Sequence, residues 1–130
     1  MEPGYRITVD RKRKLLHTEL WGLWDLALVD TWGAERLAAV ARTGNVGDYV
    51  ALYDASRVEL PTQALFARIQ HYLSDPATWC RRAAIVTGSA IQHMQIRRMT
   101  SYHTLAFFNS VAAAEAWLFE DAADEERPAA

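Results

Sequence analysis

The stretch His103-Thr-Leu-Ala-Phe-Phe108, followed at once by Asn109-Ser-Val-Ala-Ala-Ala-Glu-Ala-Trp-Leu118, decides the fold class of this chain. The first segment has the apolar and aromatic residues typical of a strand. The second begins with two residues that cap helices and continues at helical spacing, with Trp117 and Leu118 expected to face inward. The pair predicts a strand that leads directly into a helix.

The same succession of strand and helix recurs upstream. Tyr49-Val-Ala-Leu-Tyr53 and Arg82-Ala-Ala-Ile-Val-Thr87 are short apolar strands, and each precedes a segment with helical periodicity. Residues 5–9 and 15–21 alternate apolar and polar side chains, and the polar residues 10–14 between them predict a β-hairpin. The predicted order is β-β-α-β-α-β-α-β-α. It describes one α/β domain with a mixed, mostly parallel sheet of four or five strands and four helices.

The boundaries of the first helix follow from its capping residues. Asp25 is expected to cap the N-terminus through its carboxylate, and Gly44 is placed where a glycine ends a helix. The buried face between them is predicted to consist of Leu26, Val29, Gly33, Leu37 and Val40.

Two further helices are predicted from local signals. Residues 54–57 are expected to end the strand that begins at Tyr49, and Pro61 is expected to be the first residue of the second helix. The third helix follows Gly88-Ser89 and carries the apolar residues Ile91, Met94 and Met99.

The composition is that of one soluble globular domain, with 130 residues of which 51% are apolar and 23% charged. Residues 1–121 are expected to form the domain, and the acidic, alanine-rich residues 122–130 a disordered tail. No apolar run approaches the ~18 residues of a membrane-spanning helix, so membrane insertion is not expected. The N-terminus lacks the apolar core of a signal peptide, which favours a cytoplasmic protein. Cys80 is the only cysteine, which excludes an internal disulfide.

The charge distribution gives no sign of nucleic-acid binding, since the net charge is −2. The basic cluster Arg11-Lys-Arg-Lys14 lies at the expected tip of the hairpin, where charged side chains are well solvated. An exposed turn therefore explains it better than an anionic partner.

No group of residues has the composition or spacing of a catalytic or metal site. The four histidines include no pair at i,i+4 with an acidic neighbour. Ser89 and His93 lie one helical turn apart, but no acid is placed to orient the imidazole. The sequence therefore predicts no enzyme, no metal and no cofactor.

Several features together resemble a known family. They are Gly22 before the first helix, Asp54-Ala-Ser56 after the third strand, and Phe107-Phe108 followed by Ala116-Trp117-Leu118. With the element order over residues 5–119, they resemble the STAS domain. The resemblance is narrower to the SpoIIAA-like branch of small stand-alone bacterial proteins, which in turn resembles the lipid-binding CRAL-TRIO fold.

The resemblance implies a non-enzymatic signalling module that binds a protein partner. In the anti-sigma-factor antagonists of this family, a serine in an Asp-Ser pair at the start of the second helix is phosphorylated, which switches binding. The matching segment here is Leu60-Pro-Thr-Gln63, which lacks the aspartate and offers Thr62 as acceptor. The phospho-switch is therefore not expected to operate. Asp54, Ser56 and Thr62 are the candidate partner-binding or switch residues.

Five tryptophans are many for this length, and Trp21, Trp24 and Trp32 cluster around the start of the first helix. Ordinary core packing explains them. One alternative is an apolar or lipid-like ligand held between sheet and helices near Trp24, Trp32 and Met94, which implies a small carrier or sensor. Another is a homodimer face, where aromatic residues are enriched.

Overall fold

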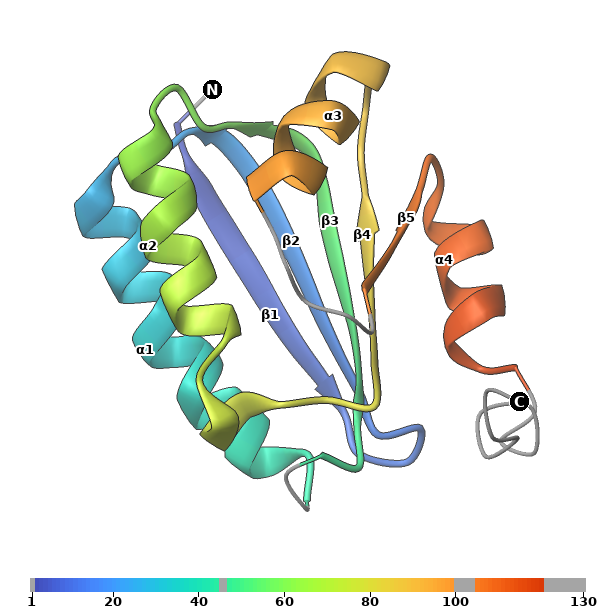
Figure 1. The fold of residues 1–130 in the computed structure, drawn as a ribbon. Helices are drawn as coiled ribbons and strands as arrows, with labels where there is room; N and C mark the ends of the chain where they lie inside the picture. Colours follow the sequence, from blue (N-terminus) through green and yellow to red (C-terminus); the bar gives the residue numbers. More distant parts are fainter. Residues whose placement is uncertain (1, 45–46, 100–104, 121–130) are drawn as a thin grey trace.

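The structure, a computed structural model, describes residues 2–44, 47–99 and 105–120. Within these residues the chain forms five strands and four α-helices in the predicted order, which confirms the predicted α/β class (Figure 1). The strands are β1 (Gly4–Asp10), β2 (Leu15–Leu23), β3 (Val50–Glu59), β4 (Arg82–Val86) and β5 (Leu105–Phe108). The helices are α1 (Leu26–Arg42), α2 (Gln63–Leu73), α3 (Ala90–Met99) and α4 (Val111–Leu118), with a short 3₁₀ helix η1 (Pro76–Thr78). Residues 103–104 of the last predicted strand and the tail 122–130 lie outside the described residues.

The sheet has the order β1-β2-β3-β4-β5, so each strand lies beside its neighbour in sequence. β1 and β2 pair antiparallel as the predicted hairpin, and the exposed residues 11–14 connect them. The pairs β2–β3, β3–β4 and β4–β5 are parallel. Each parallel pair requires a crossover, and α1, α2 and α3 supply the three crossovers.

β3 is longer than the sequence pattern predicts. The apolar run predicts a strand that ends at Tyr53, with Asp54 and Ser56 in the turn that follows. The strand instead continues to Glu59, because β2 has nine residues and pairs with β3 along this whole length across a register shift. Asp54 and Ser56 therefore belong to a strand, and the predicted boundary is wrong.

Helices cover both faces of the sheet (Figure 1). α1, α2 and α3 pack on one face, where the larger core lies, and α4 packs on the other. Side chains of β3 alternate between the two cores, with Tyr53 and Ala55 in the first and Val50 and Leu52 in the second. This arrangement explains why the strand is apolar on both faces.

α1 begins where the sequence predicts, and three of the five residues predicted for its buried face, Val29, Gly33 and Val40, are buried. Asp25 is the N-cap, and its carboxylate accepts a hydrogen bond from the Leu28 N–H at 2.8 Å. Leu26 and Leu37, predicted to be buried, are 39% and 47% exposed. The side chains buried in their place include Trp32 and Arg36. The helix is thus rotated so that an arginine faces the core.

α4 begins after the N-cap Ser110, whose hydroxyl accepts a hydrogen bond from the Ala113 N–H at 3.1 Å. Leu118 is fully buried in the second core. Trp117, also expected to face inward, is half-buried at the edge of that core. The Arg82 guanidinium lies over its ring, 4.9 Å from the centroid.

Candidate functional site

A groove opens at the end of β3, between the start of α2 and α3, and we name it the outer groove. Its volume is about 470 Å³. Its apolar lining side chains include Leu23, Leu60, Pro61, Phe66 and Ile91. Leu23 is 56% and Ile91 71% exposed, so two large aliphatic side chains lie in solvent beside the groove.

The polar part of the outer groove is almost uncharged. Its polar side chains are those of Ser56, Ser89, Gln92 and Gln95, and Glu59 is the single ionisable residue of the lining. The groove therefore offers neutral hydrogen-bonding groups and one negative charge.

The Gln92 side chain links the first turns of α3 to β3 by hydrogen bonds. Its Nε2 donates to the carbonyl oxygens of Ala55 at 2.6 Å and Val58 at 3.1 Å, and its Oε1 accepts from the Gly88 N–H at 2.6 Å. Gly88 itself lies against the strand, because a Cβ there would meet the Ser56 carbonyl oxygen at 2.6 Å. One amide side chain thus satisfies three backbone groups at this end of the sheet.

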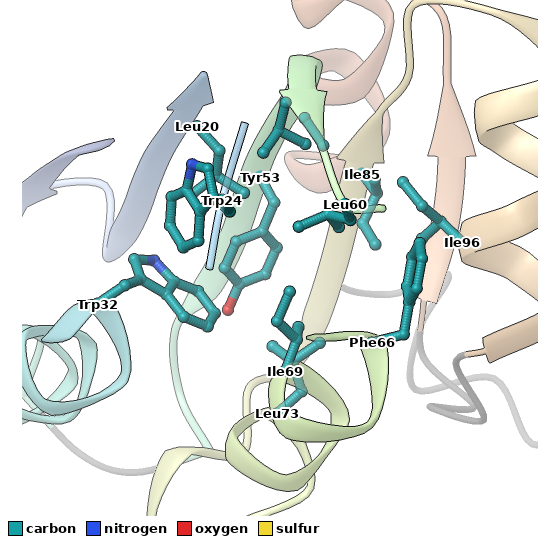
Figure 2. Close-up of a pocket in the computed structure, with 12 residues that line it drawn as sticks. Leu20, Trp24, Trp32, Tyr53, Leu60, Phe66, Ile69, Leu73, Ile85 and Ile96 are labelled. Atoms are coloured by element: carbon teal, nitrogen blue, oxygen red, sulfur yellow. The ribbon is translucent and has the colours of Figure 1, made fainter. Parts of the chain in front are cut away.

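A second, apolar space lies between the sheet and the helices, and we name it the inner cavity. It measures about 50 Å³, and its twelve lining residues are all apolar or aromatic (Figure 2). Figure 2 shows Trp24 and Trp32 on one side and Phe66 and Ile96 on the other. The two tryptophans singled out in the sequence are therefore brought together at one cavity.

Met94, the third predicted pocket residue, does not line this cavity. Its side chain is 60% exposed, whereas Ile96 is 6% exposed and belongs to the lining. Gln92 and Ile96 are four residues apart, so the helix face that Gln92 holds against β3 is also the face that buries Ile96. The apolar pattern did not distinguish this face from the one with Ile91 and Met94.

Trp32 carries an unpaired hydrogen-bond donor into the core beside the inner cavity. The residue is 2% exposed, and its Nε1 has no hydrogen-bond partner among the described residues. The indole contacts Trp24 and Tyr53 edge-on, with ring centroids 6.2 and 6.3 Å apart. A buried donor without a partner costs about 1–3 kcal/mol, so the Trp32 indole is held here by packing at the expense of a hydrogen bond.

A buried arginine supports the same wall. Arg36 is 2% exposed, and its Nε donates to the Tyr53 hydroxyl at 2.9 Å. Its Nη1 donates to the Tyr72 carbonyl oxygen at 3.2 Å and to Thr78 Oγ1 at 3.0 Å. Burial alone would lower the pKa of Arg36, but the neighbouring tyrosine oxygens raise it, so the group stays charged. Sequence reasoning missed Arg36 because its residue type predicts exposure.

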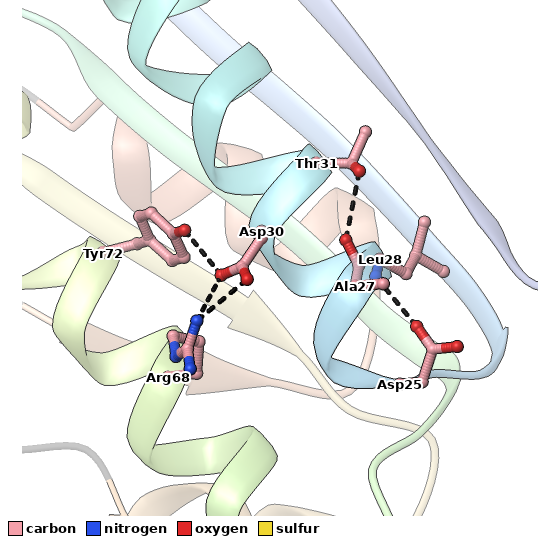
Figure 3. Close-up of polar contacts among 7 residues, drawn as sticks. All are labelled: Asp25, Ala27, Leu28, Asp30, Thr31, Arg68 and Tyr72. Atoms are coloured by element: carbon pink, nitrogen blue, oxygen red, sulfur yellow. Dashed lines mark hydrogen bonds and ion pairs between the residues drawn. The ribbon is translucent and has the colours of Figure 1, made fainter.

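α1 and α2, which form part of the cavity wall, are tied together by a polar cluster (Figure 3). Asp30 on α1 accepts hydrogen bonds from the Tyr72 hydroxyl at 2.7 Å and from Arg68 Nη1 at 2.7 and 2.9 Å. The hydrogen bonds from both residues lower the pKa of the Asp30 carboxyl, and bonding from Tyr72 has a larger effect than bonding from Arg68. The helices also approach closely, because a Cβ at Gly33 would meet the Tyr72 ring at 2.5 Å.

Asp54 and Ser56, in the middle of β3, lie together beside a polar cleft of about 500 Å³ at the carboxyl ends of β4 and β5. The Ser56 hydroxyl donates to Asp54 Oδ1 at 2.6 Å, and the Ser56 N–H donates to the same oxygen at 3.1 Å. His93 also lines the cleft and stacks on Phe107, with ring centroids 4.6 Å apart. Both Asp54 and Ser56 are half-buried, and the serine hydroxyl is already engaged.

Thr62, the third candidate switch residue, is the N-cap of α2. Its Oγ1 accepts a hydrogen bond from the Leu65 N–H at 3.4 Å. The helix begins at Gln63, two residues later than the prediction that placed Pro61 in its first turn. Thr62 is exposed, and it lines neither the outer groove nor the polar cleft.

Metal-ligand clusters and membrane-spanning helices are both absent from the residues that the structure describes. No three His, Cys, Asp or Glu side chains gather there in a way that could hold a metal ion. None of the helices in this part of the chain is both long and apolar enough to cross a membrane.

Comparison with known proteins identifies the fold. No family model and no curated protein matches the chain. Among solved structures, the chain is similar to an uncharacterized protein of the DUF3478 family, with a SpoIIAA-like fold, from Shewanella loihica PV-4. The two chains are 17% identical, the match covers 91% of this chain and 96% of the other, and the TM-score is 0.65. The fold is SpoIIAA-like.

The SpoIIAA-like fold separates the candidate residues into distinct places. Asp54 and Ser56 share the polar cleft, Ser56 also reaches the outer groove, and Thr62 caps α2 outside both. Sequence reasoning missed Gln92 and Ile96, which join the outer groove to the inner cavity. The one signal in the sequence was that these two residues are four apart on the third helix. That spacing is too common in helices to single them out.

Because Thr62 is the N-cap of α2, substitutions at this position are expected to change the stability of the protein. Thr62→Asp is expected to leave the free energy of unfolding unchanged or to raise it by up to about 1 kcal/mol. Aspartate also caps helices, and its charge meets the positive end of the helix dipole. Thr62→Ala is expected to lower the free energy of unfolding by about 1 kcal/mol. Urea unfolding of both variants checks this, and an aspartate variant less stable than the alanine variant contradicts it.

Proposed function

We propose that this protein is a non-enzymatic regulatory module that binds a protein partner at the outer groove. The observation that carries the proposal is the pair of exposed aliphatic side chains beside the groove, Leu23 at 56% and Ile91 at 71% exposure. Exposed apolar side chains that gather at one place, with polar side chains around them, are typical of interaction sites on soluble proteins. The neighbouring serine and glutamine side chains supply the polar rim of such an interface.

The SpoIIAA-like fold supports a regulatory role by its resemblance to the anti-sigma-factor antagonists. Phosphorylation is not part of the proposal. The Ser56 hydroxyl is bonded to Asp54, and Thr62 already caps α2 without the Asp-Ser pair of that family. Partner binding at this groove then depends on apolar contact rather than on a phosphate.

Site-specific photo-crosslinking in the native host tests the docking surface. A photoreactive phenylalanine analogue at position 91 is expected to give one dominant adduct, and the same analogue at position 37 is expected to give none. Leu37 is a matched control, since it is 47% exposed on α1, away from the groove. Mass spectrometry of the adduct identifies the partner, which is then purified. Ile91→Glu is expected to weaken binding of this partner at least about tenfold, and Leu37→Glu is expected to leave it unchanged. Equal adducts at both positions overturn the proposal, and an adduct to a second copy of this chain identifies the partner as a homodimer.

A second candidate function, carriage or sensing of an apolar small molecule, is favoured by the inner cavity. Its lining is wholly apolar or aromatic, and it includes the indoles of both Trp24 and Trp32. At about 50 Å³ the cavity is far smaller than the ~150 Å³ that accepts a benzene ring. A ligand therefore has to displace part of the cavity wall.

A further inference from the structure

The inner cavity and the outer groove share one wall. Four residues, Val58, Leu60, Phe66 and Ile96, line both spaces. Figure 2 shows Phe66 and Ile96 side by side at the edge of the inner cavity, across from Trp32. Movement of these side chains would join the two spaces into one site that is apolar inside and polar at its mouth.

α3 contributes Ile96 to that wall. Of its side chains over residues 90–97, Ile96 is the one that is buried. Gln92 holds the helix to β3 through the carbonyl oxygens of Ala55 and Val58, and it also accepts from the Gly88 N–H. Outward displacement of α3 would break these three bonds, withdraw Ile96 from the inner cavity and open it toward the outer groove.

The charge of the outer groove favours one class of ligand over another. Glu59 is the one ionisable residue of the groove lining, and the other polar side chains are serines and glutamines. An anionic head group would find no cation in this lining and would meet the Glu59 carboxylate. A hydroxyl, amide or ammonium group finds hydrogen-bond partners and no like charge.

We propose that the protein binds a compact amphiphile with an aromatic ring or short branched chain and a neutral or cationic end. The apolar part occupies the inner cavity between the indoles and Phe66, and the polar end lies in the outer groove. Gln92 is the latch that keeps α3 closed over this site. The inference rests on the second candidate function, that of a carrier or sensor, and gives its ligand class and its gate.

Three probes that share one ring test the charge selection. Benzyl alcohol, benzylamine and benzoate are titrated into ¹⁵N-labelled protein, and the indole N–H signals are followed by NMR. Benzyl alcohol and benzylamine are expected to shift the Trp24 and Trp32 signals, and benzoate to bind at least about tenfold more weakly. Ile96→Ala, which removes a shared wall side chain, is expected to tighten benzyl alcohol binding by about tenfold.

Two matched variants of α3 test the latch. Gln92→Met keeps the length of the side chain and removes its three hydrogen bonds, whereas Gln95→Met changes a glutamine of the same groove that does not share those bonds. Gln92→Met is expected to speed amide exchange in α3 by about tenfold and to tighten benzyl alcohol binding, because less free energy is needed to open the site. Gln95→Met is expected to change both quantities less than about twofold.

The outcomes separate the inference from the function on which it rests. If none of the three probes shifts Trp24 or Trp32 in wild type, Ile96→Ala or Gln92→Met, the carrier function itself is overturned. If the probes bind but benzoate binds as tightly as benzyl alcohol, the ligand class is overturned. If Gln92→Met behaves like Gln95→Met, the latch is overturned while ligand binding stands.

Discussion

Arg36→Ala is expected to lower the free energy of unfolding by about 3–5 kcal/mol. The guanidinium donates to the Tyr53 hydroxyl, the Tyr72 carbonyl oxygen and Thr78 Oγ1. It also lies 5.9 Å from the centroids of both the Trp32 and Tyr53 rings. Truncation to alanine removes the donor to these three polar groups. It also leaves a space beside the rings of Trp32 and Tyr53.

Two further variants of arginines on α1 separate the causes. Arg36→Met keeps much of the packing and loses the hydrogen bonds, so about half of the destabilisation is expected to remain. Arg42→Ala removes an exposed arginine of the last turn of the same helix and is expected to change the free energy of unfolding by less than about 0.5 kcal/mol. Urea midpoints and slopes give all three values. A loss below about 1 kcal/mol for Arg36→Ala would mean that this side chain is not buried.

Leu118→Ala is expected to lower the free energy of unfolding by about 2–5 kcal/mol. Leu118 is 0% exposed and lies in the core beneath α4 together with Leu15, Leu52 and Val86. α4 is a helix of eight residues whose fully buried side chains are Leu118 and the small Ala114. Loss of the leucine therefore removes the larger of the two fully buried side chains that hold this helix to the sheet.

Trp117→Ala is the informative comparison, because the sequence pattern favours the larger Trp117 as the buried anchor. Trp117 is half-buried, with Phe108 at 5.6 Å between ring centroids and the Arg82 guanidinium over its ring. We expect a loss of about 1–2 kcal/mol, since part of the ring is solvated in the folded state. Thermal or urea unfolding shows which of the two variants is less stable. If Trp117→Ala is less stable than Leu118→Ala, this assignment is contradicted.

Helix starts and the order of elements follow from short-range chemistry, and here the sequence was sufficient except at α2, which begins two residues later than predicted. The carboxylate of Asp25 and the hydroxyl of Ser110 reach backbone N–H groups three residues ahead, so both caps are visible in a window of a few residues. The alternating pattern of the hairpin is equally local. The end of β3 was missed because Asp54 and Ser56 are typical turn residues, and only pairing with the long β2 keeps them in a strand.

The candidate site was only partly predictable, because it depends on which face each helix turns inward. Trp24 and Trp32 were singled out for their number and proximity, and both line the inner cavity. Met94 was predicted as a pocket residue and Ile96 was not, since helical spacing alone does not show which apolar side chain faces inward. The structure buries Ile96, since Gln92 on the same face bonds to β3. A glutamine that bonds to backbone atoms 34 and 37 residues away leaves no trace in a local pattern.

The sequence by itself determined the α/β class, the order of the elements and the places where most of the helices begin. These properties depend on interactions among residues close together in the chain, namely capping, side-chain periodicity and turn chemistry. The tertiary structure decided the burial of Arg36, the exposure of Ile91 and the existence of an outer groove above an inner cavity. Those properties arise where β2, β3, α1, α2 and α3 meet. The shape left between packed elements depends on how their side chains fit together in space.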